Sequence, residues 1–253
     1  MRGRLTVVGM GPGEAHLVTP AVSYVLAEAT DLIGYAPYLD RVPPGPPGQT
    51  RHASDNRVEL MRAREGLRLA SEGRRVAVVS GGDPGVFAMA AAVFEAIEAG
   101  PESWREIDVI VEPGVTAMLA AAALAGAPLG GDFCAISLSD NLKSWATIER
   151  RLRAAAEADF VISLYNPQSK ARPRQLGEAF DILRQLKSAA TVVLFVRAAG
   201  TRDATLTITT LGEADLGVVD MRTLVMIGSS QTRLITRPAA PAWVYTPRGE
   251  RAS

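Results

Sequence analysis

The loop from Gly81 to Gly85 combines three glycines, the acid Asp83 and Pro84 directly after a strand-like apolar run over residues 75–79. In an open α/β sheet, ligands bind beyond the carboxyl ends of the strands. Glycine lets backbone N–H groups approach a ligand closely, and Asp83 carries the only charge of the loop. The loop therefore fits a small ligand that has both a cationic end and a carboxylate. A strand-to-helix turn without any ligand explains the same residues equally well.

Strand-like and helical segments alternate along the chain, which predicts an α/β fold. The predicted strands cover residues 5–9, 31–35, 75–79, 107–111, 133–138, 160–164, 191–196, 205–210, 223–227 and 243–245. The predicted helices cover residues 20–29, 57–72, 88–99, 118–125, 144–158 and 174–187. Thr19 followed by Pro20 predicts a capped helix start, and Asn56 with Glu59 resembles a capping box.

A break in composition over residues 126–131, rich in glycine, predicts the boundary between two α/β lobes. The expected domains are residues 1–128 and residues 129–253. The N-terminal sheet is expected to be largely parallel. The last strands lack long crossover helices, so the C-terminal sheet is expected to be mixed. Two such lobes predict a ligand site in a cleft between them.

The composition argues against several classes of protein. The 253 residues carry 27 basic and 27 acidic side chains, and a net charge of zero gives no support for nucleic-acid binding. Cys134 is the only cysteine, which rules out an internal disulfide and a multi-cysteine metal site. The chain starts directly in a strand pattern, and its longest apolar run, residues 117–125, is too short to span a bilayer. We therefore expect a soluble cytoplasmic protein without membrane contact.

The histidines and the cysteine give no metal site. His16 and His52 are the only histidines, and no further ligands are found near them in the sequence. We expect His52 to be exposed in the loop after the proline-rich run. Cys134 lies within an apolar strand and is expected to be a small buried side chain rather than a nucleophile.

The first glycine turn raises the alternative of a dinucleotide-binding domain. Gly9 and Gly11 fit the Gly-x-Gly-x-x-Gly fingerprint, but Glu14 stands at its third position. Pro12 lies inside the turn, and an acid at a helix start repels a pyrophosphate. The residues therefore argue against nicotinamide-dinucleotide binding.

Three motifs in order resemble the tetrapyrrole methyltransferase family, the S-adenosylmethionine (SAM) enzymes of cobalamin and sirohaem synthesis. They are residues 8–13 with Thr19-Pro20-Ala21 behind them, residues 80–86, and residues 113–117. Residues 85–90, 136–140, 164–169 and 228–232 resemble the branch that methylates C17 of precorrin-3B. Residues 141–145 depart from that branch, because a Leu-Thr-Pro-Trp-like segment is expected there.

The resemblance implies that SAM binds in the cleft between two lobes rather than on the first glycine turn. It assigns the amino-acid end of SAM to Gly81, Gly82, Asp83 and Val86. It brings Thr116 and Ala117 toward the cofactor from the next strand end, and it places Tyr165 and Asn166 beside the adenosine. All these positions follow predicted strands, so the residues and the resemblance agree.

The resemblance also implies a tetrapyrrole substrate with many carboxylates. The turn Gly11, Pro12 and Gly13 would line its side of the cleft. Arginines suit the carboxylates, and the candidates are Arg172, Arg174, Arg197 and Arg202, although most arginines are simply exposed. Ring contraction must move protons, so Asp140 and Tyr165 are candidate catalytic groups. A helix cap explains Asp140 as well, and packing explains Tyr165 as well.

The function expected from the resemblance is SAM-dependent methylation of precorrin-3B at C17 with ring contraction to precorrin-4, in aerobic cobalamin synthesis. One alternative is the same reaction on cobalt-factor III of the anaerobic route, or on another precorrin. A second alternative is a non-catalytic module that binds a tetrapyrrole or a nucleotide. Family habit and the apolar second half suggest a homodimer, and no nucleic-acid partner is expected.

Overall fold

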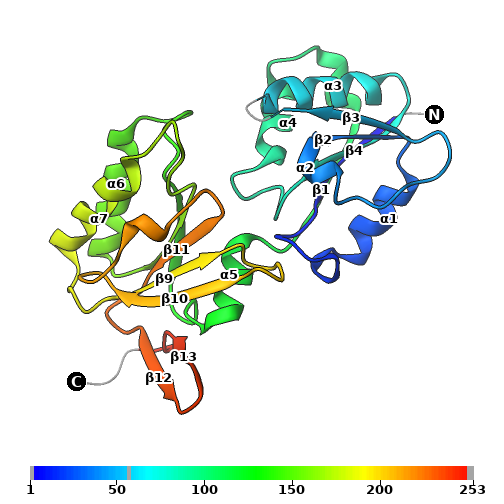
Figure 1. Cartoon of the computed structure of the whole chain (residues 1–253). Helices are drawn as coiled ribbons and strands as arrows, with labels where there is room; N and C mark the ends of the chain where they lie inside the picture. Colours follow the sequence, from blue (N-terminus) through cyan, green and yellow to red (C-terminus); the bar gives the residue numbers. More distant parts are fainter. Residues whose placement is uncertain (1–2, 56–57, 250–253) are drawn as a thin grey trace. The chain divides into compact units, whose positions relative to one another are not determined.

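The computed structural model describes residues 3–55 and 58–249. The chain divides into two compact units, Met1–Thr116 and Ala117–Ser253 (Figure 1). The expected boundary after residue 128 differs from this division, because helix α5 (Ala117–Ala125) belongs to the second unit. Its buried residues Met118 and Ala121 pack in one cluster with Leu194 and Met226 of the second sheet. None of the helices in the described residues is both long and apolar enough to cross a membrane.

The first unit is built on a five-stranded sheet in the order β3-β2-β4-β1-β5, and every neighbouring pair is parallel. The strands are β1 (Arg4–Gly9), β2 (Asp31–Tyr35), β3 (Thr50–Ser54), β4 (Arg75–Ser80) and β5 (Asp108–Glu112). The largely parallel N-terminal sheet is thereby confirmed. Since parallel strands end at one edge, the loops after β1, β4 and β5 lie together there.

Helices cover both faces of this sheet, as its continuous apolar strands require. They are α1 (Pro20–Glu28), α2 (Ala36–Leu39), α3 (Glu59–Ser71) and α4 (Met89–Glu98). Leu5 and Val78 pack with α3 and α4, whereas Val8 and Val79 pack on the opposite face with α1 and α2. Thr19 caps α1 by accepting the Val22 N–H at 3.2 Å, as its sequence predicts. The proposed start of the next helix at Asn56 and residue 57 lies outside the described residues.

The second unit carries a five-stranded sheet in the order β10-β9-β11-β8-β7, and only the β7–β8 pair is parallel. The strands are β7 (Phe133–Ser137), β8 (Val161–Tyr165), β9 (Val192–Arg197), β10 (Thr205–Thr210) and β11 (Thr223–Ile227). The predicted mixed sheet is confirmed. A smaller sheet, in the order β12-β13-β6, combines β6 (Gly126–Ala127), β12 (Arg233–Arg237) and β13 (Ala240–Tyr245).

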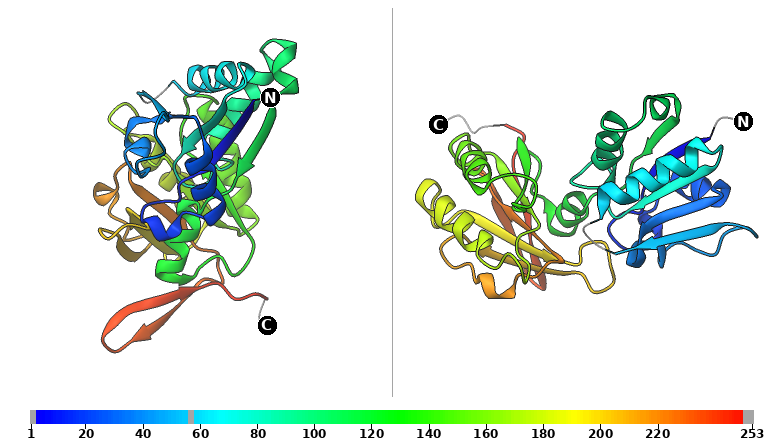
Figure 2. Two further views of the ribbon diagram at one scale, coloured as in Figure 1. Left: turned by 90° about the vertical axis from the view of Figure 1, so that its right-hand side faces the viewer. Right: turned by 90° about the horizontal axis from the view of Figure 1, so that it is seen from above.

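Alternation along β9 and β11 sorts their side chains to the two faces of the second sheet. Val193 and Ile227 pack with α6 (Trp145–Glu157) and α7 (Gln175–Leu186), which lie side by side in Figure 2. Leu194 and Met226 pack with α5 on the other face. Ser144 caps α6 and accepts the Thr147 N–H at 3.3 Å. Both faces of β9 and β11 are therefore buried, which accounts for their continuous apolar sequences.

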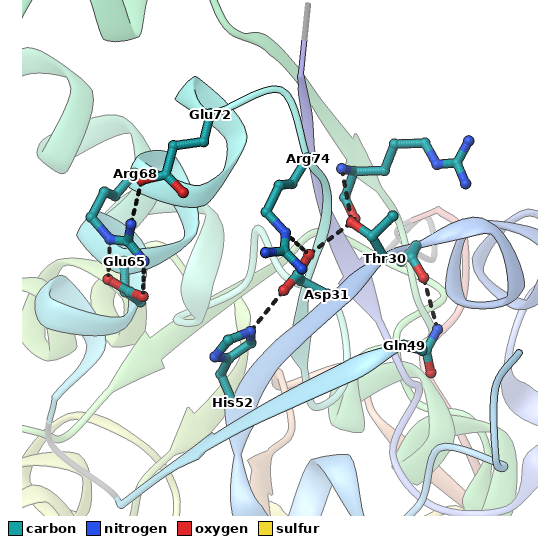
Figure 3. A network of polar contacts seen from close by, with 10 residues as sticks. Thr30, Asp31, Gln49, His52, Glu65, Arg68, Glu72 and Arg74 are labelled. Atoms are coloured by element: carbon teal, nitrogen blue, oxygen red, sulfur yellow. Dashed lines mark hydrogen bonds and ion pairs between the residues drawn. The ribbon is translucent and has the colours of Figure 1, made fainter. Parts of the chain in front are cut away.

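A polar network lies at the start of β2, away from the loop edge of the first sheet (Figure 3). Asp31 is fully buried, and its carboxylate accepts hydrogen bonds from His52 Nε2 at 2.8 Å and from Arg74 Nε at 2.6 Å. Thr30 Oγ1 donates a third bond at 2.7 Å. The expectation that His52 is an exposed loop residue is wrong, because it lies half-buried on β3 and pairs with Asp31.

This network predicts loss of stability in acid. Burial by itself would raise the pKa of Asp31, but the bonds from His52, Thr30 and Arg74 outweigh it and hold the pKa below its usual value. The stabilisation is complete above the unfolded pKa, about 3.9, and is lost as the pH falls from there through the lower pKa of the folded state. Asp31→Asn should lower the free energy of unfolding by about 1 kcal/mol at neutral pH. It should also reduce the fall of that free energy between neutral and acidic pH, which is called the acid limb below. Chemical unfolding of both proteins between neutral and acidic pH measures this, and an unchanged acid limb would contradict it.

Candidate functional site

The loop edge of the first unit brings three glycine-containing segments into direct backbone contact. Gly11 and Gly82 form an isolated antiparallel bridge, with N–H to carbonyl distances of 3.1 and 3.0 Å. A Cβ built on Gly114 would lie 2.3 Å from the Gly82 oxygen and 2.7 Å from the Gly9 oxygen. Only glycine permits so close an approach of three strand ends. The three family motifs therefore form one structural unit, although they lie far apart in the sequence.

Gly81 and Gly82 have different structural reasons to be glycine. A Cβ on Gly81 would lie 2.6 Å from the ring of Tyr38, so the aromatic side chain leaves no room for a larger residue at this position. Gly82 has a φ of +63°, which disfavours any other residue. A Cβ there would meet nothing closer than Thr116 Cα at 3.8 Å. Such contacts are of ordinary van der Waals length, so the backbone conformation of Gly82, rather than crowding, favours glycine at this position.

Asp83 serves the loop itself. Its Oδ1 accepts the Gly85 N–H at 2.8 Å, and its Oδ2 accepts the Gly114 N–H at 3.0 Å. One carboxylate therefore shapes the turn after β4 and ties it to the loop after β5. Pro84 is buried, and its carbonyl accepts the Ala90 N–H at 2.8 Å at the start of α4. These hydrogen bonds tie the loop to the protein, and a carboxylate oxygen still has lone pairs for a ligand cation.

The glycine turn after β1 is held by an arginine that the sequence analysis did not single out. Arg41 Nη2 donates to the carbonyl oxygens of Met10 at 2.6 Å, Gly11 at 3.2 Å and Gly13 at 2.9 Å. Nothing in the sequence marks Arg41 or Tyr38, because each acts on a loop about thirty or more residues away along the chain. Their importance follows only from tertiary contacts.

Tyr165 and Asn166 lie at the end of β8 in the second unit. Tyr165 is partly buried in the cluster around α5, and its Oη accepts the Met118 N–H at 3.0 Å in the first turn of that helix. Asn166 has a φ of +52°, and its Nδ2 donates to Ser137 Oγ at 2.9 Å. The Tyr165 hydroxyl thus stabilises a helix terminus whose first N–H groups have no intrahelical partner. Ala117 begins the same helix.

The proposed catalytic Asp140 lies half-buried after β7, where Gln175 Nε2 donates to its Oδ2 at 3.1 Å. It does not cap the following helix, because Ser144 does so. The opposite end of the Gln175 amide, Oε1, is buried and has no partner within the described residues.

The four candidate arginines are in different environments. Arg172 is buried, and its Nη1 donates to the Asn166 and Leu138 carbonyls at 3.2 and 3.4 Å. Arg197 pairs with Asp220 at 2.8 Å. The Arg174 side chain is 85% exposed and lies 3.9 Å from Glu178, and Arg202 is exposed. Arg172 is therefore the candidate that the fold fixes most firmly beside Asn166.

Replacing Tyr165 by phenylalanine tests which of its two roles matters. The variant lacks the hydroxyl that accepts the Met118 N–H at the start of α5. The free energy of unfolding of the second unit should therefore fall by about 1 kcal/mol. Methyl transfer should fall by less than about tenfold if the hydroxyl only supports the helix. Denaturant unfolding together with kcat measures both effects. A fall in kcat of two orders of magnitude or more at unchanged stability would instead make the hydroxyl catalytic.

Within the described residues, no group of three or more His, Cys, Asp or Glu side chains is placed to hold a metal ion. Cys134 is half-buried, and burial raises the pKa of its thiol. A raised pKa disfavours the thiolate, which is the nucleophilic form.

The chain thus combines an α/β unit, whose three glycine-containing loops meet at one edge of a parallel sheet, with a second α/β unit built on a mixed sheet. The chain belongs to the tetrapyrrole (corrin/porphyrin) methylases, whose family pattern matches residues 4–215. It is 58% identical to a precorrin-3B C(17)-methyltransferase from Sinorhizobium sp, over 98% of this chain and 97% of the relative. The resemblance drawn from the motifs is confirmed.

Two solved structures support the fold. The methyltransferase CobJ is 53% identical and has a TM-score of 0.92, covering 97% of this chain and 100% of that one. A uroporphyrin-III C-methyltransferase from Thermus thermophilus in complex with S-adenosylhomocysteine has a TM-score of 0.68 at 24% identity, covering 89% of this chain and 92% of that one. The expected tetrapyrrole methylase fold is thereby confirmed.

Proposed function

We propose that this chain methylates precorrin-3B at C17 and contracts its ring to precorrin-4, with SAM as the methyl donor. The observation that carries the proposal is 58% identity to a precorrin-3B C(17)-methyltransferase over almost the full length of both chains. The place of the reaction would be aerobic cobalamin synthesis.

The use of SAM is supported by the loop after β4. The left-handed backbone of Gly82, the fixed carboxylate of Asp83 and the nearby backbone of Thr116 suit the amino-acid end of the cofactor. Val86 and Ala117 belong to the same proposed set, and Tyr165 and Asn166 are proposed to meet the adenosine. A methylase of the same fold has been crystallised with S-adenosylhomocysteine.

SAM supplies an electrophilic methyl group, so the protein has mainly to align it with the pyrrole carbon. Alignment of this kind can lower the activation free energy by about 7–11 kcal/mol. The rigid Gly82–Gly114 contact and the Asp83 bonds hold the cofactor loop in one conformation, which favours such alignment. Asp140 and Tyr165 are the proposed groups for proton movement during ring contraction, and each accepts one hydrogen bond, from Gln175 Nε2 and from the Met118 N–H respectively.

The substrate side of the proposal assigns Gly11, Pro12 and Gly13 to the tetrapyrrole and the arginines to its carboxylates. Among these, Arg172 is buried and donates to backbone carbonyls, whereas Arg174 and Arg202 are exposed. Arg197 already forms an ion pair with Asp220, so a substrate carboxylate would have to bind beside that pair. A homodimer and a cytoplasmic location stay predictions, and light scattering of the purified protein tests the first.

The test is incubation of the purified chain with SAM and either precorrin-3B or cobalt-factor III, followed by mass spectrometry. The proposal predicts that one methyl group is gained by precorrin-3B, with slower reaction of the cobalt-containing analogue. Preference for the cobalt compound would favour the anaerobic route. Titration with S-adenosylhomocysteine separates the remaining alternative, because a non-catalytic module need not bind it.

A further inference from the structure

Arg41 occupies a central position at the loop edge of the first unit, although nothing in the motifs points to it. Its Nη2 nitrogen donates three hydrogen bonds, and all three end on carbonyl oxygens of the turn after β1. The Gly11 oxygen that it contacts also accepts the Gly82 N–H. Arg41 therefore acts on the bridge that joins the two glycine loops.

The guanidinium of Arg41 is held without a carboxylate. No acidic side chain in the described part of the chain forms an ion pair with it. Its side chain is partly buried, and the loss of water lowers the pKa of the guanidinium, although it remains charged. Charge-assisted bonds to carbonyls are stronger than neutral ones. The positive charge of Arg41 therefore strengthens the hydrogen bonds that hold the turn from Met10 to Gly13.

The backbone that carries Arg41 is itself clamped. Arg51 on β3 donates through Nη1 to the Leu39 carbonyl at 3.0 Å, and through Nη2 to the Val42 and Pro43 carbonyls at 2.9 and 2.7 Å. Tyr38, on the same segment, packs against Gly81 and stacks edge-on against Tyr35 at 5.4 Å. Residues 38–43 therefore form a fixed base from which Arg41 reaches the turn.

We propose that Arg41 is a positioning residue that fixes the turn from Met10 to Gly13 for the tetrapyrrole substrate. The inference rests on the proposed function, which assigns that turn to the substrate. The cofactor loop has separate supports in Tyr38 and in the Asp83 bonds to Gly85 and Gly114. Loss of Arg41 should therefore affect the tetrapyrrole much more than SAM.

Two variants and one control test the proposal. Arg41→Met removes the three bonds and keeps much of the side-chain length, whereas Arg41→Lys retains one cationic nitrogen with three donors. Arg75→Met is the matched control, because Arg75 is exposed and starts β4 at the opposite edge of the sheet. Each protein is measured by hydrogen exchange of residues 10–18, by S-adenosylhomocysteine titration and by steady-state kinetics with precorrin-3B.

In Arg41→Met we expect exchange in the turn and the KM for precorrin-3B each to rise about tenfold. The affinity for S-adenosylhomocysteine should stay within about threefold, because the cofactor loop keeps its own bonds. Arg41→Lys should restore part of both losses, and Arg75→Met should match the wild type. Unchanged exchange in the turn, an unchanged KM, or an equal loss of cofactor affinity would overturn the proposal.

The two proposals can fail separately. A wild-type protein that does not methylate precorrin-3B would refute the proposed function. The exchange measurement would still decide whether Arg41 holds the turn, because it needs no substrate.

Discussion

Asp83→Ala is expected to weaken S-adenosylhomocysteine binding by about thirtyfold, close to 2 kcal/mol. The carboxylate holds the Gly85 and Gly114 N–H groups at 2.8 and 3.0 Å, and hydrogen bonds to a charged acceptor contribute about 1.5–3 kcal/mol each when buried. Asp83 is partly exposed, so the smaller end of that range applies. Both loops beside the proposed cofactor would lose their common support. Isothermal titration measures the change.

Asp108→Ala is the matched control for this variant, because Asp108 is an exposed acid that pairs with Arg4 at the other edge of the same sheet. Its cofactor affinity should equal that of the wild type. Asp83→Asn should give an intermediate loss, because the amide keeps one acceptor oxygen and turns its NH2 toward an N–H donor. Full affinity in Asp83→Ala, with the fold retained by circular dichroism, would remove Asp83 from the site.

Gly114→Ala is expected to destabilise the first unit by about 3 kcal/mol or more, at the upper end for overpacked positions. The added Cβ would lie 2.3 Å from the Gly82 oxygen and 2.7 Å from the Gly9 oxygen. Both neighbours are backbone atoms at the ends of paired strands, so neither can turn aside as a side chain can. Denaturant unfolding measures the loss, and cofactor binding should fall with it.

Gly177→Ala supplies the contrast. A Cβ on Gly177 meets nothing within 4 Å, and this glycine lies inside α7. Alanine there should stabilise the helix by up to about 1 kcal/mol. If Gly114→Ala proved as harmless as Gly177→Ala, the close contact of the three glycine segments would not exist in solution.

Most strands could be predicted because their apolar runs are continuous. β2, β10 and β11 have the predicted bounds, since each carries a compact β-rich run between polar or turn residues. β3 was missed because its sequence, Thr50–Ser54, is polar and follows a proline-rich loop. β12 was missed because its residues are largely exposed and its pairing depends on β13. The predicted domain boundary differed because α5 packs by tertiary contact, which composition does not record.

The glycine loops of the site could be predicted from the sequence, but their supports could not. A motif shows that Gly81, Gly82 and Gly114 follow strands, and the parallel sheet then brings them together. The partners Tyr38 and Arg41 come from a short segment after β2 without a recognisable pattern. Asp83 was assigned to a ligand because it was the only charge of its loop, whereas its oxygens also bind the protein backbone.

The most direct test of the central claim is reaction of the purified chain with precorrin-3B and SAM carrying a ¹³C-labelled methyl group. NMR of the isolated product should show the label on C17 of a ring-contracted macrocycle. A label on any other carbon, or no transfer while S-adenosylhomocysteine binds, would contradict the account.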